Sequence, residues 1–143
     1  MYVYNRSLNV NVQSGQGEMV LINGVFLDTF HEMCLTLEIN LNTLTVIKAS
    51  GQLKRLPHQD CADVENRIPL LTGLTLRKGV RKQIKQAVGG REGCTHLADL
   101  ALQCIESLVQ ARYSIMKEIM TQEEIFTANE QFLQGTCYHF RHR

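Results

Sequence analysis

The chain lacks the features that assign many sequences to a class at first sight. Its longest apolar stretches, Met19 to Ile22 and Val25 to Leu27, are far shorter than the roughly 20 residues of a membrane span, so no membrane association is expected. It has no CxxC pair, no P-loop ending and no internal repeat. A net charge of +1 draws it neither to nucleic acid nor to a membrane surface. We therefore expect a soluble globular protein.

Cysteine is the unusual residue, with five copies in 143 residues. An odd number of Cys, with no apolar segment near the start that resembles a signal peptide, predicts reduced thiols in the cytoplasm rather than a disulfide framework. A chain of this length can bury roughly 70% of its unfolded surface in one core. We therefore expect a single domain over residues 1–143.

The first half of the chain has the period of two that is typical of strands. In residues 8–12, apolar side chains alternate with Asn, which predicts a strand with Leu8, Val10 and Val12 on a core. Further strands are expected over 19–27, 33–39 and 44–53. The phase of the third strand, extended backwards, places His31 at the end of its core face.

The second half has helical spacing. Helices are expected over residues 61–68, 76–88, 95–119 and 123–133. We expect Asp60 to cap the first of them and Pro69 to end it. Strands followed by helices predict an α+β fold, an antiparallel sheet of three to four strands with the helices of the C-terminal half packed on one face.

Two Cys coincide with predicted helix starts, where free amides and the helix dipole favour a thiolate. These are Cys61 and Cys94, and His96 follows two residues after Cys94. Together with His31 they form a set of sulfur and nitrogen ligands that suits zinc or iron. Asp28 is a weaker fifth candidate. The sequence thus predicts a metal site at one end of the sheet.

The remaining Cys have simpler interpretations. Cys104 falls in the apolar stripe of the long helix and is expected to be a buried small hydrophobic residue. Cys34 and Cys137 have no convincing partners and remain unassigned.

An enzyme is the alternative hypothesis. In it, Cys94 is the nucleophile, activated at the helix start, with His96 or His31 as its base. No Ser/His/Asp triad and no pair of carboxylates can be assembled, so turnover is less favoured than metal binding.

A run of five basic residues without acidic neighbours forms one face of the predicted helix 76–88. These residues are Arg77, Lys78, Arg81, Lys82 and Lys85. The face is either a solvated surface or a docking patch for an acidic protein partner or a phosphate-bearing ligand. Nucleic acid is less favoured because no aromatic residues for stacking accompany the charges. The oligomeric state stays open, a homo-oligomer included.

Several short motifs resemble those of an uncharacterised bacterial domain family that carries a GCTHL signature. The motifs are Phe30-His31-Glu32-Met33, Leu71-Thr72-Gly73-Leu74, Gly89-Gly90 and Gly93-Cys94-Thr95-His96-Leu97. The resemblance covers about residues 30–111. It implies membership of a family without an established activity.

A more distant resemblance is to the NifU/IscU iron-sulfur scaffold. It rests on the strand Met33-x-Leu35-x-Leu37, on Cys61 opening a helix, and on Cys94-x-x-Leu97-Ala98. In that family three Cys and an Asp hold zinc or a nascent cluster at one end of the sheet. The resemblance implies that Cys61 and Cys94 take the places of two of those Cys and that His31 takes the place of the Asp.

Thr29 stands where the scaffold family has its first Cys. With one thiol fewer, a single zinc or iron ion fits better than a [2Fe-2S] cluster, which takes about four thiolates. The expected function is therefore metal binding, storage or delivery, with His31, Cys61, Cys94 and His96 as ligands.

Overall fold

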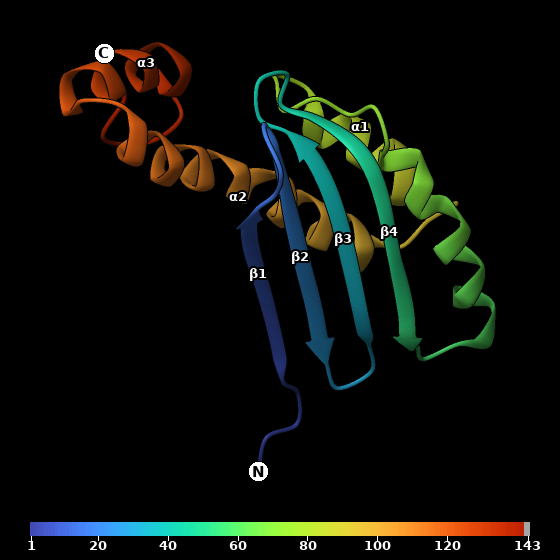
Figure 1. The fold of residues 1–143 in the computed structure, drawn as a ribbon. Coiled ribbons are helices and arrows are strands. Elements are labelled where there is room, and N and C mark those ends of the chain that lie inside the picture. The colour runs from blue at the N-terminus through green and yellow to red at the C-terminus, as the bar shows by residue number, and fades with distance from the viewer. Residues whose placement is uncertain (142–143) are drawn as a thin grey trace. The chain divides into compact units, whose positions relative to one another are not determined.

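The computed structural model describes residues 1–141, which fall into two compact units, one of residues 1–107 and one that begins at Leu108 (Figure 1). The first unit contains β1 (Arg6–Ser14), β2 (Met19–Asp28), β3 (Glu32–Asn40), β4 (Thr45–Arg55), the 3-10 helix η1 (Gln59–Leu71) and α1 (Val80–Val88). The helix α2 (Thr95–Ile119) begins in the first unit and continues into the second, which also contains α3 (Gln122–Leu133).

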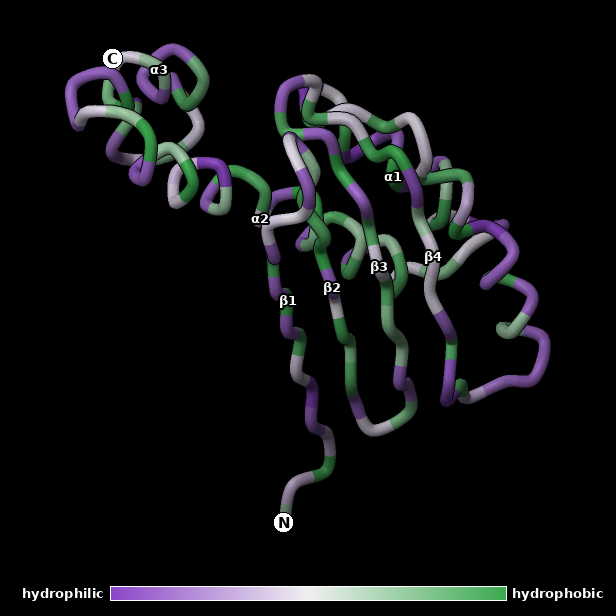
Figure 2. Tube along the Cα trace, viewed as in Figure 1, coloured by the Kyte–Doolittle hydropathy of each residue, from purple (hydrophilic) through white to green (hydrophobic). Residues whose placement is uncertain are grey.

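The four strands form one antiparallel sheet in the order β1-β2-β3-β4. Burial alternates along the central strands, and in β3 every second residue from Met33 to Ile39 is 1% exposed or less. The alternation is visible in the hydropathy of the chain (Figure 2). The α+β fold and its antiparallel sheet, followed by helices in the second half, are confirmed.

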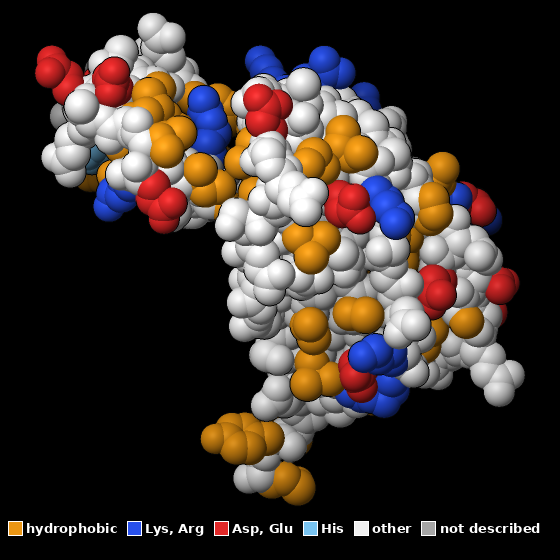
Figure 3. Space-filling model, in the orientation of Figure 1, with side chains coloured by type: hydrophobic (Ala, Val, Ile, Leu, Met, Phe, Trp, Pro, Cys, Tyr) orange, Lys and Arg blue, Asp and Glu red, His pale blue; other side chains and the backbone are white. Residues whose placement is uncertain are grey.

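The helices of the first unit cover one face of the sheet (Figure 1). Leu100 and Cys104 of α2 are both 0% exposed, and they pack so closely over Gly24 of β2 that a Cβ there would overlap Cys104 Sγ. The opposite face is mixed, with Val25, Leu27 and Ile47 between 41% and 49% exposed; it carries only scattered hydrophobic side chains (Figure 3).

The core face predicted for the first strand is only partly present. β1 lies at the edge of the sheet and has one neighbour, β2. Val10 and Val12 are half-buried, whereas Leu8 is 37% exposed. An edge position leaves side chains without a neighbour on one side, which the alternating pattern alone does not reveal.

The expected helix over residues 61–68 is a 3-10 helix with different ends. It begins after His58 rather than after a capping Asp60. It also includes Pro69 and ends at Leu71. The fixed φ of proline, near −65°, is compatible with 3-10 geometry, so Pro69 does not stop this element.

The helix expected over residues 76–88 begins later, at Val80. Leu76 instead donates its backbone N–H to the Leu44 carbonyl at 2.9 Å, and Gly79 precedes the helix with φ of 92°. This left-handed conformation favours glycine and separates the loop from the helix.

The two C-terminal helices agree with the periodicity. α2 runs from Thr95 to Ile119, and α3 starts with a capping box between Thr121 and Glu124. Within residues 1–141, no helix combines the length and apolar character required to cross a bilayer.

Candidate functional site

The turn between β2 and β3 is organised by one buried carboxylate. Asp28 Oδ1 accepts hydrogen bonds from the backbone N–H groups of Phe30 (2.8 Å) and His31 (2.7 Å). The same oxygen lies 2.9 Å from His31 Nδ1. Asp28 Oδ2 accepts from the Tyr4 hydroxyl at 2.8 Å and pairs with Arg6 at 3.4 Å. Such an Asx turn lets one side chain set both the backbone path and the orientation of His31.

Residues from two other segments hold this turn in place. The Arg55 guanidinium donates to the carbonyls of Asp28 and Thr29 at 2.7 Å each, and to that of His31 at 3.2 Å. Thr29 exchanges backbone and hydroxyl hydrogen bonds with Asn5 at 3.1 Å. The end of β4 and the segment before β1 therefore both fix the position of His31.

A tight loop between α1 and α2 positions the other residues of the site, Cys94 and His96. Cys94 donates its backbone N–H to the Val88 carbonyl at 2.8 Å, which folds the loop back onto the end of α1. A Cβ on Gly93 would overlap backbone atoms of Val88 and Gly89, so the close approach requires glycine there. The first turn of α2 follows directly and places His96 within reach of the β2–β3 turn.

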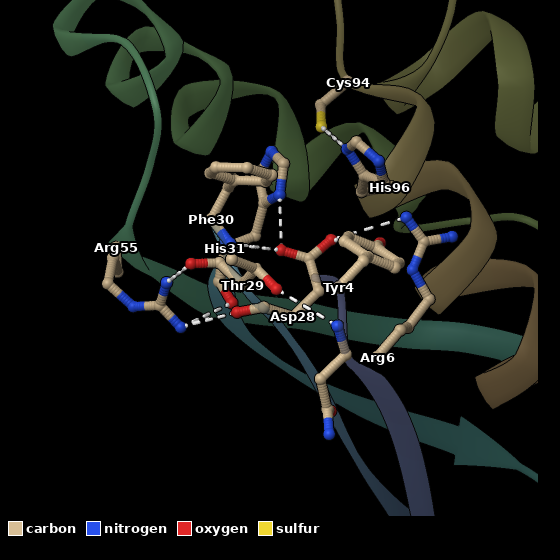
Figure 4. Close-up of polar contacts among 10 residues, drawn as sticks. Tyr4, Arg6, Asp28, Thr29, Phe30, His31, Arg55, Cys94 and His96 are labelled. Atoms are coloured by element: carbon tan, nitrogen blue, oxygen red, sulfur yellow. Dashed lines mark hydrogen bonds and ion pairs between the residues drawn. The ribbon is translucent and has the colours of Figure 1, made fainter. Parts of the chain in front are cut away.

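The two halves meet at a pair of imidazoles (Figure 4). The ring centroids of His31 and His96 are 4.2 Å apart, and ligand atoms of Asp28, His31 and His96 all lie within 4.8 Å of one another. Cys94 Sγ lies 3.8 Å from His96 Nδ1, and the Phe26 ring lies 5.3 Å from that of His96. The arrangement brings nitrogen, oxygen and sulfur donor atoms together beside the ring of Phe26.

The surroundings of the site favour the ionised form of Asp28 and the neutral form of His96. Burial opposes ionisation of Asp28, but hydrogen bonds from the His31 side chain, the Phe30 N–H and Tyr4 outweigh it and hold the pKa of Asp28 well below its ordinary value. The pKa of His96 is lowered by burial and, after that, by His31 and Arg6. A neutral His96 keeps a nitrogen lone pair, which metal binding and general-base chemistry both require.

The structure thus brings three of the four predicted ligand residues together. His31 and His96 belong to the cluster, and Cys94 touches it through His96. The weaker candidate Asp28 is the hydrogen-bonding centre of the site. Cys61 lies half-buried in η1 and does not belong to the three-residue cluster, so its role as a ligand stays a prediction.

Sequence reasoning missed the residues that position the site. Tyr4, Arg6 and Arg55 act through hydrogen bonds to the β2–β3 turn, and no motif marks them. The Asp-x-x-His spacing of Asp28 and His31 is the one local signal that would have indicated their pairing.

The basic residues do not form one helical face. Arg77 and Lys78 precede α1, and Arg81 pairs with Glu106. All five of the predicted residues are exposed. Docking of an acidic protein partner at these residues stays a prediction.

Comparison with known proteins gives a family but no activity. Residues 11–110, more than two thirds of the chain, match the family described as Protein of unknown function (DUF2889). No curated protein and no solved structure matches. The resemblance to the NifU/IscU scaffold therefore remains a prediction from the sequence.

Proposed function

We propose that this chain, which belongs to the DUF2889 family of unknown function, is a metal-binding protein. The ion would be held by the imidazoles of His31 and His96 and the thiolate of Cys94. One observation carries the proposal, which is the convergence of these side chains: ligand atoms of Asp28, His31 and His96 lie within 4.8 Å of one another, and Cys94 Sγ lies 3.8 Å from His96 Nδ1. Imidazole and thiolate donors suit zinc and iron(II).

The contact between Asp28 and His31 supports this choice. When His31 Nδ1 carries the proton and donates it to the carboxylate at 2.9 Å, Nε2 keeps its lone pair. Carboxylates commonly hold metal-binding imidazoles in this way and raise their basicity. Asp28 already accepts hydrogen bonds at both oxygens. We therefore assign it an orienting role rather than a place among the ligands.

An iron-sulfur cluster fits the same residues less well. The donors near the centre are one thiol and two imidazoles, whereas clusters take about four thiolates. Thr29, at the position of the missing scaffold Cys, has its hydroxyl engaged by the Asn5 N–H at 3.1 Å. A single ion for storage or delivery is the better match to this donor set, and Cys61 would complete a four-coordinate site if η1 brought its thiol to the ion.

Elemental analysis of untagged protein purified without oxygen tests the proposal. We expect about one zinc or iron per chain, and Zn²⁺ affinity, measured against a competing chelator, that falls about 100-fold or more in His31→Gln, His96→Gln and Cys94→Ser. Asp28→Asn should weaken affinity about 10- to 100-fold by releasing His31. The Cys61→Ser variant tests whether Cys61 is the fourth ligand.

The controls replace the same residue types away from the cluster. His58→Gln and Cys34→Ser should leave the affinity unchanged, and circular dichroism should show every variant folded. A chain without stoichiometric metal, whose Zn²⁺ affinity is the same in His96→Gln and Cys94→Ser as in the wild type, would refute metal binding.

A second function is favoured by the approach of Cys94 Sγ to His96 Nδ1 at 3.8 Å. In it, a neutral His96 takes the thiol proton and Cys94 attacks an electrophilic substrate. If the purified chain holds no metal and His96→Gln slows alkylation of Cys94 about tenfold at pH 7, the nucleophile replaces the metal site as the better assignment. Unchanged alkylation would exclude His96 as the base.

A further inference from the structure

The two edge strands of the sheet, β1 and β4, differ in whether other segments of the chain hydrogen-bond to their outer side. On β4, Val46 donates its N–H to Leu74 and accepts from Gly73, both at 2.8 Å. Leu53 donates its N–H to a carboxylate oxygen of Glu65 at 2.9 Å. The outer edge of β4 is thus covered by η1 and the segment after it, which protects it from pairing with another strand.

Within the first unit, residues 1–107, β1 pairs only with β2 and has no such cover. At its two ends, the Thr29 N–H bonds to the Asn5 carbonyl and the Gly15 N–H bonds to the Met19 carbonyl. Hydrogen-bonded pairs alternate in an antiparallel ladder, so the odd-numbered residues of β1 bond inward to β2. The even-numbered residues, which are Arg6, Leu8, Val10, Val12 and Ser14, turn their N–H and C=O groups outward.

The exposed edge also lacks the usual protection against pairing. Residues 7–14 contain no charged residue and no proline, and β1 pairs with β2 over nine residues without a register shift. Figure 3 shows no charged side chains along this part of the edge. A long, regular and uncharged edge is a template for another strand.

We propose that this edge pairs with β1 of a second copy of the chain, in antiparallel orientation about a two-fold axis between the two Val10 residues. That register pairs all nine residues of each β1. It sets Leu8 opposite Val12 on the helix-covered face, and Asn9 opposite Asn11 on the other face. Residues whose backbone N–H and C=O groups point outward then pair only with one another, as an antiparallel ladder requires.

The pattern of side chains supports a second copy rather than an unrelated strand. The segment Leu8-Asn9-Val10-Asn11-Val12 is nearly symmetric about Val10, so apolar groups meet apolar groups and amides meet amides. Leu8, at 37% exposed, would gain an apolar neighbour. One strand pair buries less area than a stable dimer usually needs, about 1,200 Å² or more, so we expect micromolar affinity.

A charge exchange on the exposed face tests this register. Asn9→Lys with Asn11→Lys places like charges opposite each other twice and should raise the dimer dissociation constant about tenfold or more. Asn9→Lys with Asn11→Asp places opposite charges there and should keep dissociation within about threefold of wild type. Both variants lose the same Asn11–Asn9 contact of 2.8 Å, so they are matched.

Sedimentation equilibrium up to about 1 mM protein is the measurement, with the mass expected to rise towards twice 16.3 kDa. A wild-type chain that stays monomeric, or two charge variants that associate equally, would overturn the proposal. Val10→Pro removes an outward N–H without breaking the ladder to β2, and it should give a folded monomer. Loss of association in Val10→Pro supports the edge, whereas a folded Val10→Pro dimer contradicts it.

Discussion

Two cysteines ten positions apart lie in opposite chemical settings on either side of the first turns of α2. Cys94 is half-buried just before the helix, with Sγ 3.8 Å from His96 Nδ1. Cys104 is 0% exposed, and burial raises the pKa of its thiol to about 12. The first thiol is available for chemistry, and the second is a core residue.

The difference follows from where α2 crosses the sheet. Cys104 packs on Gly24 in the middle of β2, where backbone groups are paired within the sheet. Cys94 lies beside the end of β2, where the ladder stops and the free N–H groups turn to Asp28 instead. Polar side chains gather at the strand end because unpaired backbone groups there need partners.

Thiol labelling should show the largest effect. In the folded protein at pH 8, we expect alkylation of Cys104 to be at least about 1,000-fold slower than that of Cys94, since almost no thiolate forms at a buried site. Mass spectrometry of the labelled peptides measures both rates in one sample, and unfolding in urea should remove the difference. Similar native-state rates would refute the contrast.

A smaller effect is expected from adding a side chain at Gly24, in the middle of β2. Gly24→Ala should lower the free energy of unfolding by about 2 kcal/mol, because its methyl group would meet Cys104 and Leu100. Adding Cys104→Ala removes one of the two clashes, so the double variant should be about 1 kcal/mol more stable than the sum predicts. Urea titration measures both.

The control for this pair is a cysteine on the other face of the sheet. Cys34 lies opposite Val25, and its side chain points away from Gly24. Gly24→Ala combined with Cys34→Ala should therefore be additive. Coupling equal to that of Cys104 would show that the effect does not come from the contact.

Periodicity predicted most of the fold because most elements have one buried face. The alternation from Met33 to Ile39 predicts the third strand with its correct phase. The errors fall where tertiary context decides. Leu8 belongs to an equally regular alternation of apolar and polar residues, but its strand lies at the edge of the sheet. Asp60 is a residue type that often caps helices, but here it lies inside a 3-10 helix that begins at Gln59.

The candidate site was predictable to the extent that strand phase and helix starts placed its residues. Phase placed His31 at the end of the core face, and the helix start placed Cys94 and His96. The hydrogen bonds from Arg55 and Tyr4 join segments more than 20 residues apart in sequence, and no local pattern reports such contacts.

The smallest expected effect is a pH dependence at the site end of α2. The pKa of His96 is lowered by burial first and by His31 and Arg6 next, although Asp28 and Asp99 act in the other direction. The unfolded chain therefore binds a proton at this residue more readily than the folded chain does. Its contribution to stability is complete above the ordinary histidine pKa of about 6.5 and is lost as the pH falls through the lowered value.

Urea unfolding from pH 5 to 7.5 should then show the free energy of unfolding rising with pH, with a contribution from His96 that stays below one proton, or about 1.4 kcal/mol per pH unit. His96→Gln should flatten that rise, whereas His58→Gln, which changes an exposed histidine, should leave it unchanged. An equal slope in wild type and His96→Gln would mean that the site end of α2 does not favour a neutral imidazole.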